Sequence, residues 1–282
     1  MRKFLLTSAI LAMCFAKALL EWFTFAFDSD LFSYCLLIPV VSAYLVWSRR
    51  NELDQIPQHR SALAWIPGLC GLLILLCWWS VGKTSWNLAR QDYVALMILA
   101  FWLLLMAAAL FFIGARTLWT FFFPAVFLLF MSPFPTFLQK WIAVGLQYGS
   151  AEVSHWFLKL AGMPVLRTDT VFQLPGFRME VAPQCSGIHS TLVLMIVSIV
   201  GSYLFLRRPV NRLLLVFAVI PLALLRNGLR IFTIGQLCVH VSPEMINSYI
   251  HKQGGPIFFA LSLVPFFLLL LSLRHFEIHR SR

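Results

Sequence analysis

Residues 93–113 read YVALMILAFWLLLMAAALFFI, an apolar run without a charged residue. A helix needs about 20 such residues to cross the hydrocarbon core of a bilayer. On both sides of this run the chain contains further apolar segments of the same kind, and the one that ends in Ser132-Pro133-Phe134-Pro135 should break there. The eight predicted spans are 4–27, 31–48, 62–80, 93–113, 117–132, 188–206, 213–236 and 256–273.

The composition indicates an all-α polytopic membrane protein without a separate soluble domain. Apolar residues make up 60% of the chain and charged residues only 12%, against about 25% in a typical soluble domain. We therefore predict one membrane domain over residues 1–282. The net charge of +11 does not indicate nucleic acid, because the basic residues cluster in short loops between apolar runs.

The distribution of Lys and Arg predicts the orientation of the chain in the cytoplasmic (inner) membrane. With both termini in the cytoplasm, twelve of the 22 basic residues lie at inside ends and seven in outside loops. Four of those seven fall in one long segment, 136–184, where the charge rule is weaker. The inside set is Arg2, Lys3, Arg49, Arg50, Arg60, Arg116, Arg207, Arg208, Arg212, Arg274, Arg280 and Arg282.

Segment 136–184 is the only sizeable stretch that should not span the membrane. Its first part, about 137–161, mixes polar and apolar residues and is typical of an amphipathic helix lying on the membrane. Two short runs, 170–174 and 177–181, flank Pro175-Gly176 and predict a β-hairpin. We expect an extracytoplasmic helix and hairpin within the single membrane domain.

The hairpin leads directly to residues 180–190, EVAPQCSGIHS, which contain the cysteine of greatest interest. Pro183 and Gly187 should shape a turn, and an apolar helix begins near Ile188. Cys185 would then precede a helix N-terminus, where unpaired N–H groups and the helix dipole favour a thiolate and can hold an oxyanion. The local pattern leaves open a nucleophile or a cysteine that is simply packed in a turn.

Two arginines lie within the seventh apolar segment, in Leu225-Arg226-Asn227-Gly228-Leu229-Arg230-Ile231. Residues four apart share a helix face. An arginine inside a membrane segment is costly and is a functional candidate by default, although it can also extend to the interface as an anchor.

Histidines offer further candidates for acid–base chemistry. His251 precedes the eighth segment and would lie outside, near the membrane surface, on the same side as Cys185. Its imidazole can exchange protons near neutral pH, while a lone interfacial histidine can also be structural. His189, one turn beyond Cys185, could line the same site. The cysteines show no metal-binding spacing, so we predict no metal site and no cofactor.

Taken in order, these motifs resemble the exosortase/archaeosortase family of membrane cysteine proteases and transpeptidases. The family has a Cys-Ser-Gly motif after an extracytoplasmic hairpin, then Asn-x-x-Arg, then a histidine followed by glycine and paired phenylalanines. The corresponding residues here are Cys185-Ser186-Gly187, Asn227 with Arg230, and His251 with Gly255, Phe258 and Phe259. Arg226 stands where the family more often has a small residue, and His189 where an arginine is common.

The resemblance implies a function and a set of roles. Cys185, Arg230 and His251 would be catalytic, and substrate would be bound by Arg226, Asn227, Ser186, Gly187 and His189. The implied partners are exported proteins with a C-terminal signal made of a short motif such as Pro-Glu-Pro, a transmembrane helix and a basic tail. Their cleavage or transpeptidation would take place at the outer face of the membrane, in association with exopolysaccharide export.

Other classes of membrane protein fit part of the pattern. In a transporter or flippase-like protein the buried arginines would bind an anionic headgroup, and Cys185 would be dispensable. A membrane acyl- or glycosyltransferase and a non-catalytic scaffold for polysaccharide export are further alternatives. The activity of a Cys185→Ala variant separates the cysteine enzyme from all of these.

Overall fold

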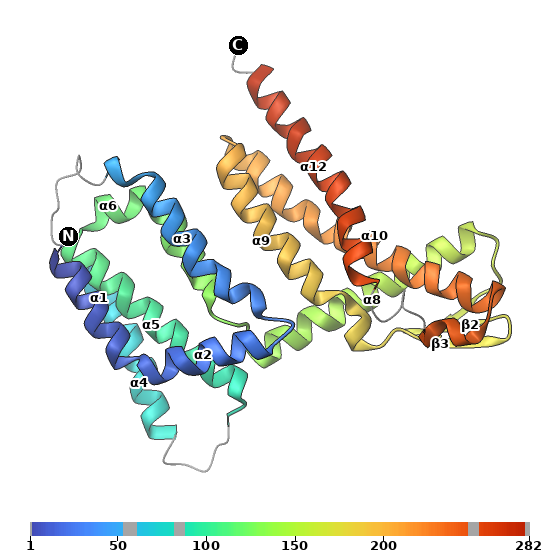
Figure 1. Ribbon diagram of the computed structural model, residues 1–282, viewed down its shortest axis with the longest axis horizontal. Coiled ribbons are helices and arrows are strands. Elements are labelled where there is room, and N and C mark those ends of the chain that lie inside the picture. The colour runs from blue at the N-terminus through green and yellow to red at the C-terminus, as the bar shows by residue number, and fades with distance from the viewer. Residues whose placement is uncertain (1, 53–60, 82–87, 248–253, 280–282) are drawn as a thin grey trace. The chain divides into compact units, whose positions relative to one another are not determined.

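A computed structural model describes residues 2–52, 61–81, 88–247 and 254–279. The chain forms two compact units, Met1–Gln139 and Lys140–Arg282, and Figure 1 shows the helices and strands of each. Helices dominate both units, as the composition predicts, because only a helix satisfies all its backbone groups within one apolar segment.

The first unit is entirely helical in its described residues. Its long helix α5 packs against α4 and both halves of a bent N-terminal pair, α1 and α2, around a core of Phe15, Ala18, Met97 and Ala100. The elements are α1 (Arg2–Cys14), α2 (Ala16–Asp28), η1 (Ser33–Leu36), α3 (Leu37–Ser48), η2 (Arg50–Glu52), η3 (Ala62–Ala64), α4 (Trp65–Val81), α5 (Arg90–Phe112), α6 (Ala115–Thr120), α7 (Phe122–Phe127) and η4 (Leu128–Met131).

The expected break at Ser132-Pro133-Phe134-Pro135 is present, and the helices on either side of it meet at 91°. Backbone groups freed at membrane depth need partners inside the protein. Gln91 donates to the Phe134 carbonyl at 2.6 Å, and the Asp92 carboxylate accepts from the N–H of Thr136 at 2.6 Å. Consecutive residues at the start of α5 therefore stabilise the break.

The second unit combines long helices with one small sheet. Helices α9, α10 and α12 pack side by side, and the sheet packs against α8 and α10. The elements are α8 (Thr136–Leu160), β1 (Leu166–Thr168), β2 (Val171–Leu174), β3 (Phe177–Glu180), η5 (Pro183–Ser186), α9 (Ile188–Phe205), α10 (Pro209–His240), η6 (Pro243–Asn247) and α12 (Gly255–His279).

The predicted hairpin is confirmed as strands β2 and β3, which pair antiparallel with Phe172 opposite Met179. Gly176 has φ +71°, which suits the third position of a type II turn after Pro175. A third strand, β1, was not predicted and pairs with β2. Phe172 and Met179 are buried against Leu158 of α8 and Ile234 of α10, so the sheet has a core of its own with the helices.

Helix α8 is amphipathic, but one stripe of uncharged polar side chains on it faces the protein. Gln147, Ser150 and Ser154 are buried, whereas Phe137 and Trp141 are 74% and 80% exposed. Outward aromatic side chains on a membrane protein suit the lipid or its interface. The prediction that this helix lies on the membrane surface stays a prediction.

Within the described residues, five helices are long and apolar enough to cross a membrane, or up to seven if each bent pair counts as one span. The bent pairs are α1 with α2, at 72°, and the pair on either side of the proline break. Ser33–Ser48 forms a shorter apolar helix. The protein is therefore a multi-pass membrane protein, while the count of eight spans stays a prediction.

Candidate active site

Cys185 lies in a short 3₁₀ turn between β3 and α9, as the sequence predicts. Its N–H donates to the Ala182 carbonyl at 2.8 Å, and its side chain is half-buried. Gly187 ends the turn with φ +72°, a conformation that L side chains rarely adopt, and α9 begins at Ile188. Gly187 is the N-cap residue of α9 and makes no side-chain capping bond to the N–H groups of the first turn.

Arg226 and Asn227 of α10 donate hydrogen bonds to the backbone of this loop. Asn227 Nδ2 donates to the Cys185 carbonyl at 2.8 Å, and Arg226 Nη2 donates to the Gly187 carbonyl and to Thr191 Oγ1, both at 3.2 Å. Arg226 is 7% exposed and Asn227 2%. A Cβ atom at Gly187 would lie 3.1 Å from Asn227 Oδ1 and 3.2 Å from Arg226 Nη2, so glycine is required by space as well as by φ.

Cys185 and Arg230 line the same cavity, whose volume is about 230 Å³. Asn227 forms part of this wall, and so does Glu180 at the end of β3. The remaining wall is apolar and is formed by Met179, Val181, Ala182, Ile231, Ile234 and Ile246. A cysteine, a guanidinium and an amide converge here on a small space with apolar sides, which is the general form of a small-molecule or peptide site.

One comparison with known proteins decides the family. The family model described as Transmembrane exosortase (Exosortase_EpsH) matches residues 22–268, which include Cys185, Arg230 and His251. The chain belongs to the transmembrane exosortase family. Membership of this family indicates a membrane protein that processes the sorting signals of exported proteins. No curated protein and no solved structure matches the chain.

Only some of the predicted site residues of this exosortase family member come together in the described structure. Arg226, Asn227 and Gly187 contact the loop or one another, as stated above. Ser186 is 1% exposed, and its hydroxyl has no hydrogen-bond partner among the described residues. His189 is exposed in the first turn of α9. His251 lies outside the described residues.

The structure adds two residues to which the sequence analysis gave no role. Glu180 lines the cavity beside Arg230. Gln147 of α8 donates from Nε2 to the carbonyl of Val181, just before the cysteine loop, at 2.5 Å. The spacing of Gln147, Ser150 and Ser154 along one helix face is a sequence signal for a polar face, but it does not show what that face contacts.

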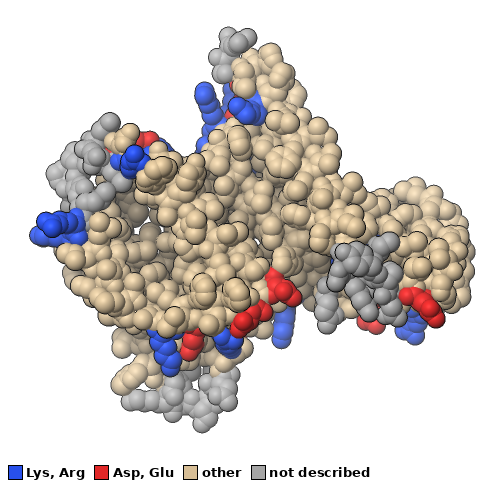
Figure 2. Space-filling view, in the orientation of Figure 1, with Lys and Arg blue, Asp and Glu red and all other residues tan. Residues whose placement is uncertain are grey.

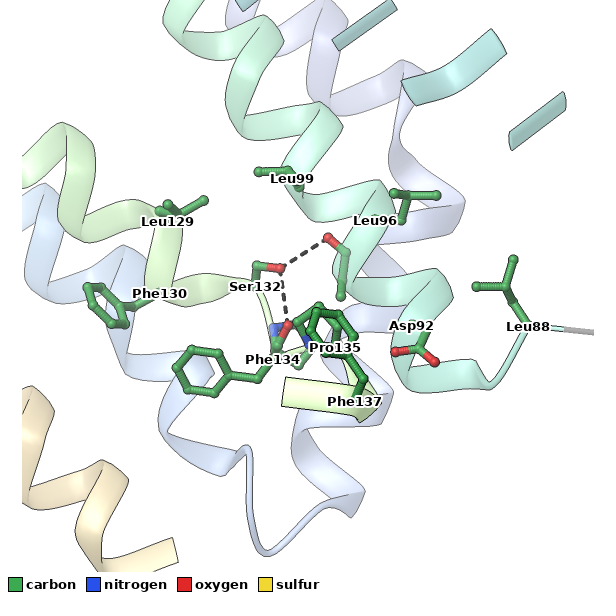
Figure 3. A pocket seen from close by; sticks show the side chains of 12 residues that line it. Leu88, Asp92, Leu96, Leu99, Leu129, Phe130, Ser132, Phe134, Pro135 and Phe137 are labelled. Carbon is green, nitrogen blue, oxygen red and sulfur yellow. Dashed lines mark hydrogen bonds between the residues drawn. The ribbon is translucent and has the colours of Figure 1, made fainter. Parts of the chain in front are cut away.

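The first unit of this exosortase family member contains a larger cavity, of about 710 Å³, beside the proline break. Figure 3 shows its lining side chains, including Leu96, Leu129 and Phe137, around Ser132. Asp92 is the only charged side chain among the lining residues. Its second carboxylate oxygen accepts from Thr136 Oγ1 at 2.9 Å, so both oxygens already bind the start of α8. We assign this carboxylate a structural role.

Proposed function

We propose that this protein is a thiol protease or transpeptidase that cleaves C-terminal sorting signals of exported proteins at the outer face of the inner membrane. The observation that carries the proposal is the cavity lined by both Cys185 and Arg230 at the start of α9. The cysteine backbone is held there by Asn227. Family membership supports a protein substrate.

In the proposed reaction, the Cys185 thiolate attacks the scissile carbonyl, and the C–N bond breaks to give a thioester and an amine. The leaving nitrogen takes a proton from His251, acting as general acid. Water or an acceptor amine then loses a proton to His251 and attacks the thioester, which releases the thiolate. Water gives hydrolysis and an amine gives transpeptidation.

The structure supports Arg230 rather than Arg226 as the residue that stabilises the oxyanion. Arg226 is buried and uses Nη2 to bind a carbonyl of the loop and Thr191. Arg230, one turn further along α10, lines the cavity that contains Cys185. A guanidinium suits this role because it stays charged in a partly desolvated site and offers donors in a fixed plane.

Cys185 and two basic residues lie at opposite ends of α9, which supports the proposal that Cys185 faces the outside. Cys185 precedes α9, whereas Arg207 and Arg208 follow it. The backbone N–H groups of both arginines donate to the buried carboxylate of Glu277, near the end of α12, at 2.7 and 2.9 Å. Figure 2 shows Lys and Arg side chains gathered at this end of the second unit. If that basic end is cytoplasmic, a helix that spans the bilayer places Cys185 at the outer face.

The proposed substrate carries a short motif, a transmembrane helix and a basic tail. Such a helix would enter the lipid beside the enzyme, so that the motif reaches the outer surface at the depth of Cys185. Holding two reactants in one geometry can supply much of a rate enhancement. The apolar walls of the cavity, formed in part by Ile231 and Ile234, suit the apolar part of such a motif.

The test is co-expression with a protein that bears such a signal, followed by mass spectrometry of its new C-terminus. Cys185→Ala and Cys185→Ser should abolish processing while the protein still inserts, and His251→Ala should slow it by about 10²–10⁴-fold. Cys70→Ala is the matched control, because Cys70 is exposed on α4 of the other unit. Normal processing by Cys185→Ala would exclude the thiol mechanism.

A further inference from the structure

Three backbone carbonyls around Cys185 accept hydrogen bonds from side chains that are distant in the sequence. The Cys185 and Gly187 carbonyls are held by Asn227 and Arg226 of α10. The Val181 carbonyl is held by Gln147 of α8, at 2.5 Å and in a buried position. Two different helices therefore fix the two ends of the segment that carries the nucleophile.

Gln147 itself is held in place by the packing of α8 on α10. Ser154, two turns further along α8, shares its hydroxyl proton between the Ser150 carbonyl at 2.6 Å and the Gly228 carbonyl of α10 at 3.2 Å. The absence of a side chain at Gly228 permits this approach, since a Cβ there would lie 2.5 Å from Val153 Cγ1. Gln147 is 7% exposed. The helix that carries Gln147 therefore packs on the helix that carries Asn227 and Arg230.

Val181 connects Gln147 to the turn that holds Cys185, and the backbone between them is restricted. Its N–H donates to the Thr170 carbonyl at 2.9 Å, its carbonyl accepts from Gln147, and its side chain is buried. Ala182 is extended, with φ −67° and ψ 154°, as a residue before proline prefers. Pro183 then restricts φ. A shift of Val181 would therefore move the turn that holds Cys185.

We infer that Gln147 is a positioning residue for Cys185, acting from α8 through the Val181 carbonyl. It sets the backbone position of the turn whose cysteine lines the cavity together with Arg230 and Glu180. The inference rests on the proposed function for its catalytic consequence. The position of the thiol can be measured without any substrate.

The experiment uses the full-length protein in detergent and in membranes. Alkylation of Cys185 by iodoacetamide is followed over time at a fixed pH by mass spectrometry of its peptide, and processing of a co-expressed substrate is followed in parallel. Gln147→Met keeps the length of the side chain but removes the donor. Ser150→Ala is the matched control, one turn along the same buried face, because the Ser150 hydroxyl has no partner among the described residues.

Gln147→Met should change the rate at which Cys185 is alkylated at a fixed pH, because the turn that carries the thiol moves relative to the cavity. Processing should fall on the order of 10²-fold, which is the cost of a displacement of about 1 Å in an active site. Ser150→Ala should behave as the wild type. An alkylation time course of Gln147→Met that superposes on that of the wild type would overturn the inference.

Gln147→Glu provides a second test that a purely structural role would not pass. The protonated carboxyl can donate to the Val181 carbonyl, whereas the carboxylate cannot. Processing relative to the wild type should therefore be retained at low pH and lost as pH rises. A constant ratio across pH would overturn the inference, even if Gln147→Met fails to fold.

The two proposals fail in different ways. If Gln147 controls the alkylation rate but the wild type processes no signal-bearing protein, the positioning role stands and the proposed function does not. If the wild type processes its substrate and both Gln147 variants match it, the positioning role alone is wrong.

Discussion

Asn227 Nδ2 donates a 2.8 Å hydrogen bond to the carbonyl oxygen of Cys185, across 42 positions of sequence. Asn227 is 2% exposed, so its amide has little access to water as an alternative partner. The bond joins the cysteine turn to α10 and fixes the backbone from which the thiol projects. It also places the cysteine relative to Arg230, which lies one turn further along the same helix.

Asn227→Asp should slow processing by roughly 10- to 100-fold while leaving membrane levels close to normal. A carboxylate cannot donate to the Cys185 carbonyl, and leaving a buried acceptor unsatisfied costs about 1–3 kcal/mol. A processing time course measures the effect. Asn211→Ala is the control, because Asn211 lies at the other end of α10 and donates to Glu277. Equal rates for Asn227→Asp and the wild type would contradict the role given to this bond.

Arg230→Ala should reduce the rate by about 10²–10³, the usual effect of removing an oxyanion donor. Arg230→Lys should be nearly as slow, because an ammonium does not reproduce the planar fork of a guanidinium. The measurement is a processing time course at matched membrane levels. If Arg230→Ala processed at wild-type speed and Arg226→Ala were inactive, the oxyanion donor would be Arg226, one turn earlier on the helix.

Gly228→Ala should destabilise the second unit by about 1–3 kcal/mol, the usual cost of overpacking. The new Cβ would lie 2.5 Å from Val153 Cγ1 and 3.3 Å from the backbone nitrogen of Ser154, which cannot rotate away. Thermal unfolding in detergent measures the change. Gly201→Ala on α9 is the control, since nothing lies within 4 Å of its Cβ position. Equal melting temperatures for the two variants would show that α8 does not pack closely at Gly228.

Reporter fusions test the proposed sidedness. Fusions after residues 55 and 210 should report the cytoplasm, and fusions after residues 86 and 245 the outside. The physical reason is the excess of Lys and Arg at the inside ends. An outside signal after residue 210 would place Cys185 on the cytoplasmic side, because α9 separates the two positions.

Much of the second unit could be predicted from local patterns in the sequence. The apolar run 188–206 corresponds to α9 (Ile188–Phe205), and the runs around Pro175-Gly176 correspond to β2 and β3. Strand β1 was missed because it has three residues, Leu166–Thr168, and lacks an apolar alternation long enough to recognise. The bend between α1 and α2 at Phe15 was also missed, since neither glycine nor proline marks it.

Local sequence patterns are enough to predict a helical membrane protein in which Cys185 lies in a turn before a helix. Apolar content, helix length and turn chemistry are local properties, so they can be read along the chain. The tertiary structure alone decided that Arg226 holds the loop while Arg230 lines the cavity, although both lie on one face of α10. It also brought Gln147 to Val181. Which donor meets which carbonyl depends on how α8 and α10 pack, and that packing joins residues far apart in the sequence.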